Sequence, residues 1–189
     1  MLVGVTGTPG SGKSHFAKRL AKRVRGSHII ELNAIVEKYG AFSGHDRFGT
    51  KIVRMRELEA GLREEMGRNG SAVVIVVGHL IPDMRTKTDI CVVVRSGLDR
   101  LIRVLKGRGY PTEKIRDNVL AEALDYCGIR ETGKARELYE VETENDKKAA
   151  VEYIAEVAMG RKTARPRTRE ITKMGELLEL INGRGISRL

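Results

Sequence analysis

The sequence lacks the features of membrane and secreted proteins. No apolar stretch reaches about 18 residues, the length that a membrane-spanning helix needs. The first residues carry no basic segment, and glycines interrupt their short apolar run, so we expect no secretory signal. These absences predict a cytoplasmic protein without a membrane partner.

Cysteine is also scarce. Cys91 and Cys127 are the two cysteines of the chain. They are too few and too far apart for a disulfide framework or a zinc site. We expect two buried thiols in a reducing compartment.

Positive charge, by contrast, is abundant. Lys and Arg number 35 against 25 Asp and Glu, a net charge of +10, which favours a polyanionic partner or substrate. Half of this excess lies in residues 161–189, which hold eight basic and three acidic residues. Residues 161–169 could bind RNA through its phosphates. No aromatic residues interleave there for base stacking, so a solvated linker explains the charge equally well.

Hydrophobic periodicity predicts alternating strands and helices. The predicted strands are 1–6, 28–32, 72–77, 90–94 and 138–142. The predicted helices are 13–24, 52–68, 98–106, 115–126 and 146–159, and 171–181 is a further apolar helix that would dock on the core or on a partner. Two of the strands are continuous apolar runs, as in a sheet covered on both faces. We therefore expect a three-layer α/β/α fold with a parallel sheet of about five strands. Because residues 7–14 between the first strand and the first helix read Gly-Thr-Pro-Gly-Ser-Gly-Lys-Ser, this fold is expected to be of the P-loop NTPase type.

The strongest chemical signal is residues 7–14, which match G-x-x-x-x-G-K-[ST] between a predicted strand and a predicted helix. Gly7, Gly10 and Gly12 would let the backbone N–H groups, including that of Ser11, converge on phosphate oxygens. The following helix adds the partial positive charge of its N-terminus.

The end of this loop predicts the bound cofactors. Lys13 would reach the β- and γ-phosphates of ATP, and the hydroxyl of Ser14 would bind Mg²⁺. The backbone N–H of His15 is placed for the α-phosphate. We therefore expect ATP and Mg²⁺ as cofactors.

A phosphate loop alone does not choose among kinases, GTPases and motor ATPases. The buried strand 72–77 ends in Val77-Gly78-His79 and lacks the Asp-Glu that ends this strand in large ATPases. The guanine-reading N-K-x-D is absent as well. A small phosphotransferase remains.

A cationic flap is predicted around Gly107 and Gly109. Five cations lie in fourteen residues there: Arg103, Lys106, Arg108, Lys114 and Arg116. Phosphoryl transfer depends on cations placed around the phosphate oxygens, so we expect Arg108 to contact ATP and to act in catalysis. A solvated helix end is the alternative for Arg108.

Other candidates have structural alternatives. His79 follows a strand at the rim where ligands bind, or it makes only a local hydrogen bond. Asp46 and Arg47 could bind an acceptor nucleotide or form a surface ion pair. Asn118 and Glu122, spaced i, i+4, could support the flap or be solvated.

Several of these motifs together resemble the adenylate kinase isoenzyme 6 family, archaeal and eukaryotic P-loop kinases of nucleoside monophosphates (NMPs) linked to maturation of the small ribosomal subunit. The resemblance covers about residues 1–159. It rests on the phosphate loop, Gly78-His79, Arg108-Gly109-Tyr110, Lys114-Ile115, Asp117-Asn118 and Glu122.

The resemblance implies an organisation and an activity. It implies a P-loop NMP kinase domain over residues 1–160, with an NMP-binding insertion at about 28–51 and a lid at about 107–117. Residues 161–189 would form a basic extension with the docking helix. It further implies weak ATPase activity and a partner among the small-subunit ribosomal proteins.

The chain departs from the family pattern at three places. Val77-Gly78-His79 stands where the family has D-x-H, so the metal- or water-positioning Asp is absent, and Asp83 is a candidate substitute. Arg54 replaces an Asp before the helix that follows the insertion, and Val104 replaces an Arg.

Two functional hypotheses follow. The first is an NMP kinase, with AMP as the expected acceptor, that also hydrolyses ATP and takes part in rRNA maturation. The second is a ribosome-assembly or RNA-binding factor switched by ATP, with little kinase activity.

Overall fold

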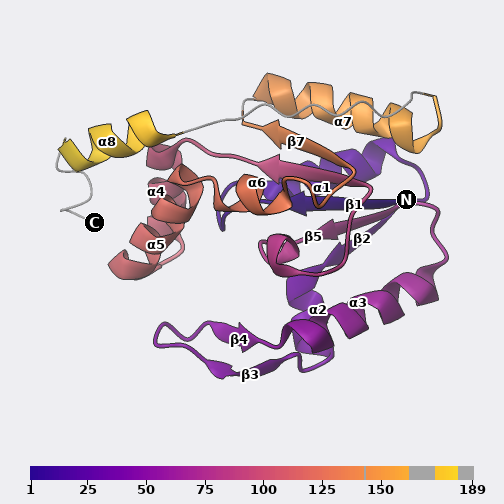
Figure 1. The fold of residues 1–189 in the computed structure, drawn as a ribbon, viewed down its shortest axis with the longest axis horizontal. Coiled ribbons are helices and arrows are strands. Elements are labelled where there is room, and N and C mark those ends of the chain that lie inside the picture. The colour runs from indigo at the N-terminus through magenta and orange to yellow at the C-terminus, as the bar shows by residue number, and fades with distance from the viewer. Residues whose placement is uncertain (143, 162–172, 183–189) are drawn as a thin grey trace.

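The computed structural model describes residues 1–142, 144–161 and 173–182. Its centre is a parallel sheet in the order β2-β5-β1-β6-β7 (Figure 1). The strands are β1 (Leu2–Thr6), β2 (His28–Glu31), β5 (Val74–Val77), β6 (Ile90–Val94) and β7 (Glu137–Val141). Every residue of β5 and β6 is buried, as expected for strands covered on both faces. The predicted α/β fold is confirmed.

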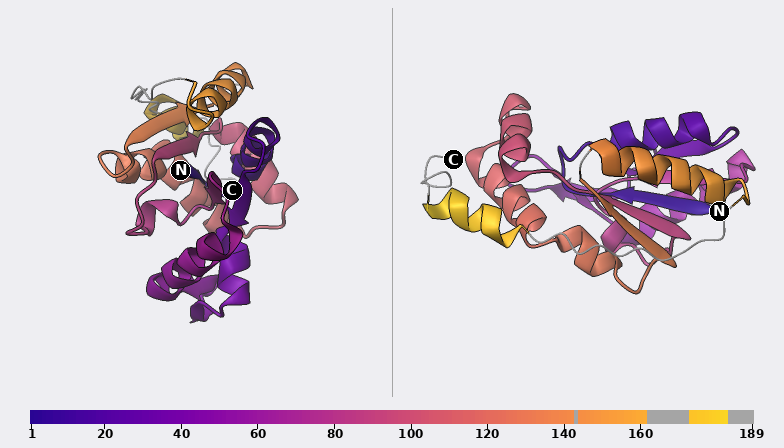
Figure 2. Two further views of the ribbon diagram at one scale, coloured as in Figure 1. Left: turned by 90° about the vertical axis from the view of Figure 1, so that its right-hand side faces the viewer. Right: turned by 90° about the horizontal axis from the view of Figure 1, so that it is seen from above.

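Helices form a layer on each face of the sheet. The first face carries α1 (Lys13–Arg23) and α7 (Glu144–Ala158), which lie side by side in Figure 2. The second face carries α2 (Leu32–Lys38), α3 (Met55–Asn69), α6 (Tyr126–Glu131) and the short 3-10 helix η1 (Ile81–Asp83). Both cysteines are buried and free, as predicted.

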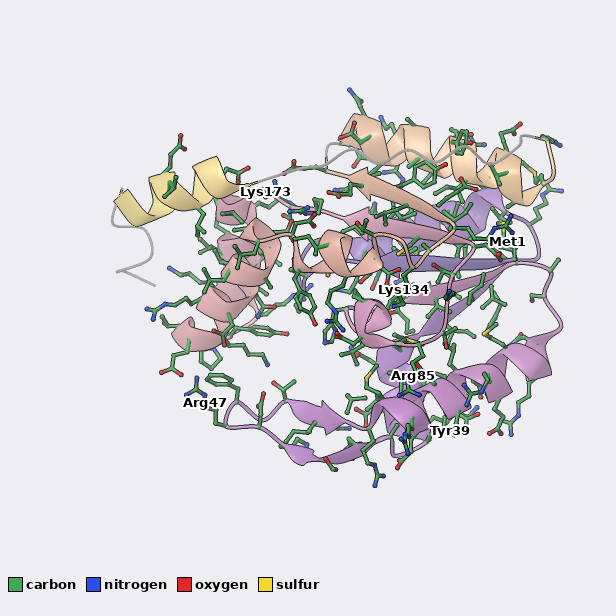
Figure 3. The ribbon with its side chains drawn as sticks, in the orientation of Figure 1. Met1, Tyr39, Arg47, Arg85, Lys134 and Lys173 are labelled. Carbon is green, nitrogen blue, oxygen red and sulfur yellow. The ribbon has the colours of Figure 1, made fainter. Side chains whose placement is uncertain are left out.

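A third apolar cluster lies beyond the carboxyl ends of the strands. It joins α4 (Leu98–Gly107), α5 (Thr112–Ala123) and α8 (Met174–Asn182) (Figures 1 and 2). Leu177 of α8 is buried in this cluster, and the carboxylate of Glu176 accepts a hydrogen bond from the N–H of Leu98 over 3.0 Å. The buried ammonium of Lys173 (Figure 3) pairs with Glu142 and Glu176. In the described part of the extension, α8 therefore covers the N-terminal end of α4.

Two predicted helices have wrong boundaries. The helix predicted over 52–68 begins only at Met55, because β4 (Lys51–Val53) pairs antiparallel with β3 (Phe42–His45). A carboxylate oxygen of Asp46 closes this hairpin by accepting 2.8 Å hydrogen bonds from the N–H groups of Phe48 and Thr50.

The helix predicted over 115–126 spans Thr112–Ala123 instead. Asp125 takes a left-handed conformation (φ 52°) and caps α6 by accepting from the N–H of Gly128. Its carboxylate therefore favours the start of a new helix over the continuation of α5.

Some sequence expectations fall outside the described residues. Residues 162–172 hold most of the basic segment predicted to bind RNA and the first two residues of the helix predicted over 171–181. Within the described residues, no helix is both long enough and apolar enough to cross a membrane.

Candidate functional site

The loop between β1 and α1 has the backbone that its glycines allow. Gly7, Gly10 and Gly12 have φ values of 139°, 93° and 98°, which L side chains rarely adopt. A Cβ on Gly7 would collide with the carbonyl oxygen of Val94, and one on Gly10 would lie 3.1 Å from the side chain of Leu101. The loop is therefore held tightly between the end of β6 and α4.

Thr8 organises the inside of this loop. Its carbonyl oxygen accepts hydrogen bonds from the N–H of Ser11 over 3.1 Å and from the ammonium of Lys13 over 3.2 Å. Burial, together with the nearby charge of Arg108, lowers the pKa of Lys13 to about 8. Such a desolvated ammonium is well placed for an anion, which would restore its preference for the charged form.

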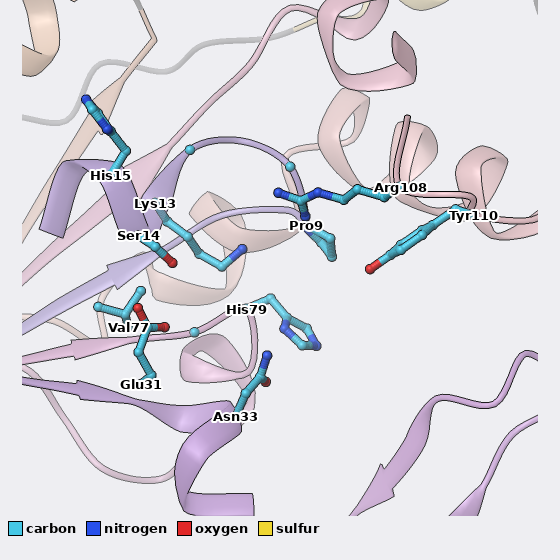
Figure 4. Close-up of a pocket in the computed structure, with 13 residues that line it drawn as sticks. Pro9, Lys13, Ser14, His15, Glu31, Asn33, Val77, His79, Arg108 and Tyr110 are labelled. Carbon is cyan, nitrogen blue, oxygen red and sulfur yellow. The ribbon is translucent and has the colours of Figure 1, made fainter. Parts of the chain in front are cut away.

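A cleft of about 350 Å³ opens over the loop, where the carboxyl ends of β1, β2 and β5 meet (Figure 4). Open α/β sheets bind ligands at this edge. The cleft is lined by Pro9, Gly10, Gly12, Lys13, Ser14, His15, Glu31, Asn33, Val77, Gly78, His79, Arg108 and Tyr110.

Most of the predicted site residues line this cleft. Gly7 and Ser11 are buried beneath it, so their contribution would come from the backbone. The side chain of His15 is exposed and points away from Lys13 (Figure 4), in line with a backbone role. The individual roles of these residues remain predictions.

Arg108 lies opposite the loop. It follows the last turn of α4, and Gly109 takes a left-handed φ of 70° directly after it. Figure 4 shows its guanidinium directed over Pro9, on the same side of the cleft as the ammonium of Lys13. The cleft thus brings together two cations from segments 95 positions apart in sequence.

Of the other four cations of the predicted flap, one contacts the hairpin and three are exposed. Lys114 donates to the hydroxyl of Thr50 in the hairpin over 2.8 Å. Arg103, Lys106 and Arg116 are exposed and do not line the cleft.

A second cavity of about 440 Å³ adjoins the first and lies between α2, the hairpin and the start of α3. Asn33, His79 and Tyr110 line both cavities. Burial lowers the pKa of His79 to about 4, helped by the charge of Lys13, so its imidazole is neutral near pH 7. His79 is therefore a neutral hydrogen-bonding group between two ligand-sized spaces.

Two residues predicted for the acceptor have other contacts. Asp46 closes the hairpin turn, and neither it nor Arg47 lines the second cavity. Arg47, at the tip of the hairpin in Figure 3, forms a 3.1 Å ion pair with Glu113 of α5. The surface ion pair is thus the interpretation that the structure favours for Arg47.

Asp83 does not take the place of the missing Asp. Its carboxylate accepts from the hydroxyl of Tyr126 over 2.6 Å and pairs with Arg130 over 3.1 Å. It does not line the cleft of Lys13 and Ser14.

Glu122 is buried, so the solvated alternative is wrong for it. One carboxylate oxygen accepts from the Thr8 hydroxyl over 2.7 Å. The other accepts from Arg95 Nε over 2.9 Å and from the N–H of Ser96 over 3.0 Å. Glu122 therefore ties the phosphate loop to the segment that enters α4.

Sequence reasoning missed three residues of the cleft. Glu31, Asn33 and Tyr110 line it without having been assigned a role. The position of Glu31 at the end of a predicted strand was the available signal, because the carboxyl ends of parallel strands meet at one edge.

Comparison with known proteins agrees with this geometry. The family described as AAA domain matches residues 3–125. The chain is 33% identical over 144 residues to a "Putative adenylate kinase" from Methanosarcina barkeri, covering 76% of this chain and 77% of the relative. It is 33% identical over 168 residues to a protein of the same name from Archaeoglobus fulgidus, covering 88% and 87%.

Among solved structures, shikimate kinase from Bacteroides thetaiotaomicron superimposes with a TM-score of 0.52 at 17% identity. The match covers 84% of this chain and 98% of that one. This similarity shows the fold alone.

Proposed function

Since the chain belongs to the AAA-domain family and to the family of the archaeal proteins named "Putative adenylate kinase", we propose that it is an NMP kinase that transfers the γ-phosphoryl group of ATP to AMP or another NMP. The observation that carries the proposal is the pair of adjoining cavities. One contains the phosphate loop, and both share Asn33, His79 and Tyr110. Two ligands could therefore lie with their phosphates next to each other, as transfer between nucleotides requires.

The residues of the first cavity suit this transfer. Charge on the transferred group is spread over its oxygens, so fixed cations lower the barrier. Lys13 and Arg108 supply two such cations to the cleft, one from the phosphate loop and one from the end of α4. The hydroxyl of Ser14, one residue further along α1, would bind Mg²⁺ that a nucleotide brings with it.

Magnesium would supply further neutralisation of the phosphates. No group of three or more His, Cys, Asp or Glu that could hold a metal by itself occurs among residues 1–142, 144–161 and 173–182. The cleft with Ser14 therefore suits Mg²⁺ that arrives with the nucleotide better than it suits a metal held by the protein alone. Mg²⁺ is usually held by one or two protein groups plus substrate phosphates.

Lys13 leads to a predicted pH dependence of ATP binding. Its pKa is about 8 in the free protein, and bound phosphates would raise that pKa. ATP binding should therefore take up a proton at about pH 8–9 and weaken as the pH rises, by up to about tenfold per pH unit. Calorimetric titrations in two buffers of different ionisation enthalpy measure the uptake. Lys13→Met should abolish it, and an unchanged uptake in that variant would contradict the assignment.

Further roles follow from the family resemblance. We propose slow ATP hydrolysis in the absence of an acceptor and participation in small-subunit rRNA maturation, with a small-subunit ribosomal protein or rRNA as partner. The net charge of +10 supports an RNA partner more than a basic protein. The second candidate function is an ATP-driven switch that controls the binding of this ribosomal partner, with little kinase activity.

The formation of ADP with and without AMP tests the proposal. A kinase converts one ATP and one AMP into two ADP, so AMP should raise the initial rate of ADP formation at least about tenfold, because the bound acceptor replaces water at the reacting phosphoryl group. A panel of other NMPs measured in the same way ranks the acceptors. Turnover that is independent of every NMP would instead support the ATP-driven switch.

A further inference from the structure

The phosphate-binding cleft has no carboxylate on the strand where P-loop enzymes usually carry one. In P-loop enzymes Mg²⁺ is held by the loop Ser or Thr and by an Asp at the end of a buried strand. Here β5 ends at Val77, and Asp83 is engaged with Tyr126 and Arg130. β5 therefore presents Val77, and not an acidic residue, at this end of the cleft near Ser14 (Figure 4).

The neighbouring strand carries a carboxylate at the same level. β2 pairs parallel with β5, and Glu31 is the direct partner of Val77 in the register. Partners in a parallel pair point to the same face of the sheet, and neighbouring strands lie only about 4.8 Å apart. Val77 packs on the α1 side of the sheet, as does Ile29, two positions before Glu31. The side chain of Glu31 therefore lies on the face where α1 begins.

The surroundings of Glu31 point to a cation. Its carboxylate lines the cleft with Lys13 and Ser14, and its charge acts to raise the pKa of Lys13. Among the described residues it has no hydrogen bond or ion pair. A carboxylate in a cleft that binds phosphates would repel them unless a cation stood between the two.

We propose that Glu31 is the carboxylate that holds Mg²⁺ with Ser14 in this chain, in place of an acidic residue at position 77. The metal-binding carboxylate then stands on β2 and not on the adjacent strand β5. The side chain of Glu is one methylene longer than that of Asp, which extends its reach toward Ser14. This inference rests on the proposed use of ATP but not on the identity of the acceptor.

Nucleotide binding with and without magnesium tests the assignment. The probe is the non-hydrolysable ATP analogue AMP-PNP, titrated calorimetrically in excess Mg²⁺ or in EDTA. In Glu31→Gln, the gain in affinity from Mg²⁺ should fall by at least about 10–100-fold, the loss that is typical even for groups that only support the ligands of a metal. In EDTA the same variant should bind as tightly as the original chain or more tightly, because a repulsive charge has gone. A merely structural role would weaken binding in both conditions.

Placing a carboxylate at position 77 in the Glu31→Gln variant tests whether the magnesium dependence can be restored. Glu31→Gln combined with Val77→Asp should regain most of the magnesium dependence, because Val77 is the register partner of Glu31 and the new carboxylate would stand at the same level of the sheet. Glu64→Gln, an exposed glutamate of α3, is the matched control and should leave both affinities unchanged. Should Glu31→Gln lower the Tm, Glu31→Ala is measured in the same way.

The outcomes separate this inference from the proposed function. An unchanged magnesium dependence in the Glu31 variants, or no rescue by Val77→Asp, overturns the assignment and leaves the kinase proposal standing. Conversely, absence of AMP-stimulated ADP formation in the original chain overturns the kinase proposal, while the two binding affinities still decide the role of Glu31.

Discussion

Lys13→Ala lowers the rate of phosphoryl transfer by about 10²–10³-fold, the usual effect of losing one preorganised charge next to a reacting group. The ammonium lies inside the phosphate loop, 3.2 Å from the carbonyl oxygen of Thr8, and Lys13 lines the cleft together with Arg108. The loss should appear in kcat, measured as ADP formation at saturating ATP and AMP.

The same substitution, Lys13→Ala, should not destabilise the fold. Burial lowers the pKa of Lys13 to about 8, so folding disfavours its charged form at neutral pH. Removing the ammonium should therefore leave the Tm unchanged or raise it, as thermal unfolding followed by circular dichroism would show. Lys18→Ala, an exposed lysine of the same helix, is the control and should keep full activity. A folded Lys13→Ala protein with more than half of the original turnover would refute the role of the loop.

Arg95→Ala destabilises the fold by about 3–5 kcal/mol, the cost of breaking a buried ionic group by removing one partner. Only 1% of Arg95 is exposed. Its guanidinium contacts Glu122 over 2.9 Å, Asp125 over 2.6 Å and Glu140 over 2.9 Å. Although burial lowers the pKa of Arg95, these carboxylates raise it above its ordinary value. Without Arg95, three negative charges remain close together with little solvent.

The measurement is the free energy of unfolding in urea together with the Tm. A loss of 3–5 kcal/mol corresponds to a drop in Tm of about 6–20 °C for a chain of this size. Arg136→Ala is the control, because Arg136 is exposed and lies 3.7 Å from Asp89, and such surface pairs contribute at most about 1 kcal/mol. A loss below about 1 kcal/mol in Arg95→Ala would show that the three carboxylates do not depend on Arg95.

Local sequence patterns were sufficient for most of the fold. The five strands of the main sheet were predicted within two residues of their observed limits, because continuous apolar runs between glycine-rich turns can be satisfied only by burial on both faces. The hairpin of β3 and β4 was missed. Its strands are short and partly exposed, and a side-chain turn at Asp46 closes it, so no apolar alternation marks it.

The phosphate loop could likewise be located from the sequence. Its glycines, Lys13 and Ser14 are adjacent in the chain, and their roles depend on backbone geometry that a local motif specifies. Arg108 was named because cations gather around two glycines, a signal that is also local.

By itself, then, the sequence determined the order along the chain of the five main-sheet strands and of the longer helices, the phosphate loop and the family, but not α2, α6 or the β3–β4 hairpin. Only the tertiary structure decided which distant residues complete the site. Glu31 and Val77 are partners because β2 and β5 lie side by side, although 46 positions separate them. Glu122 meets Thr8 across 114 positions, and what makes it a structural carboxylate and not a solvated one is burial against Arg95. Such relations depend on strand order and on desolvation, and neither is a property of any local stretch of the chain.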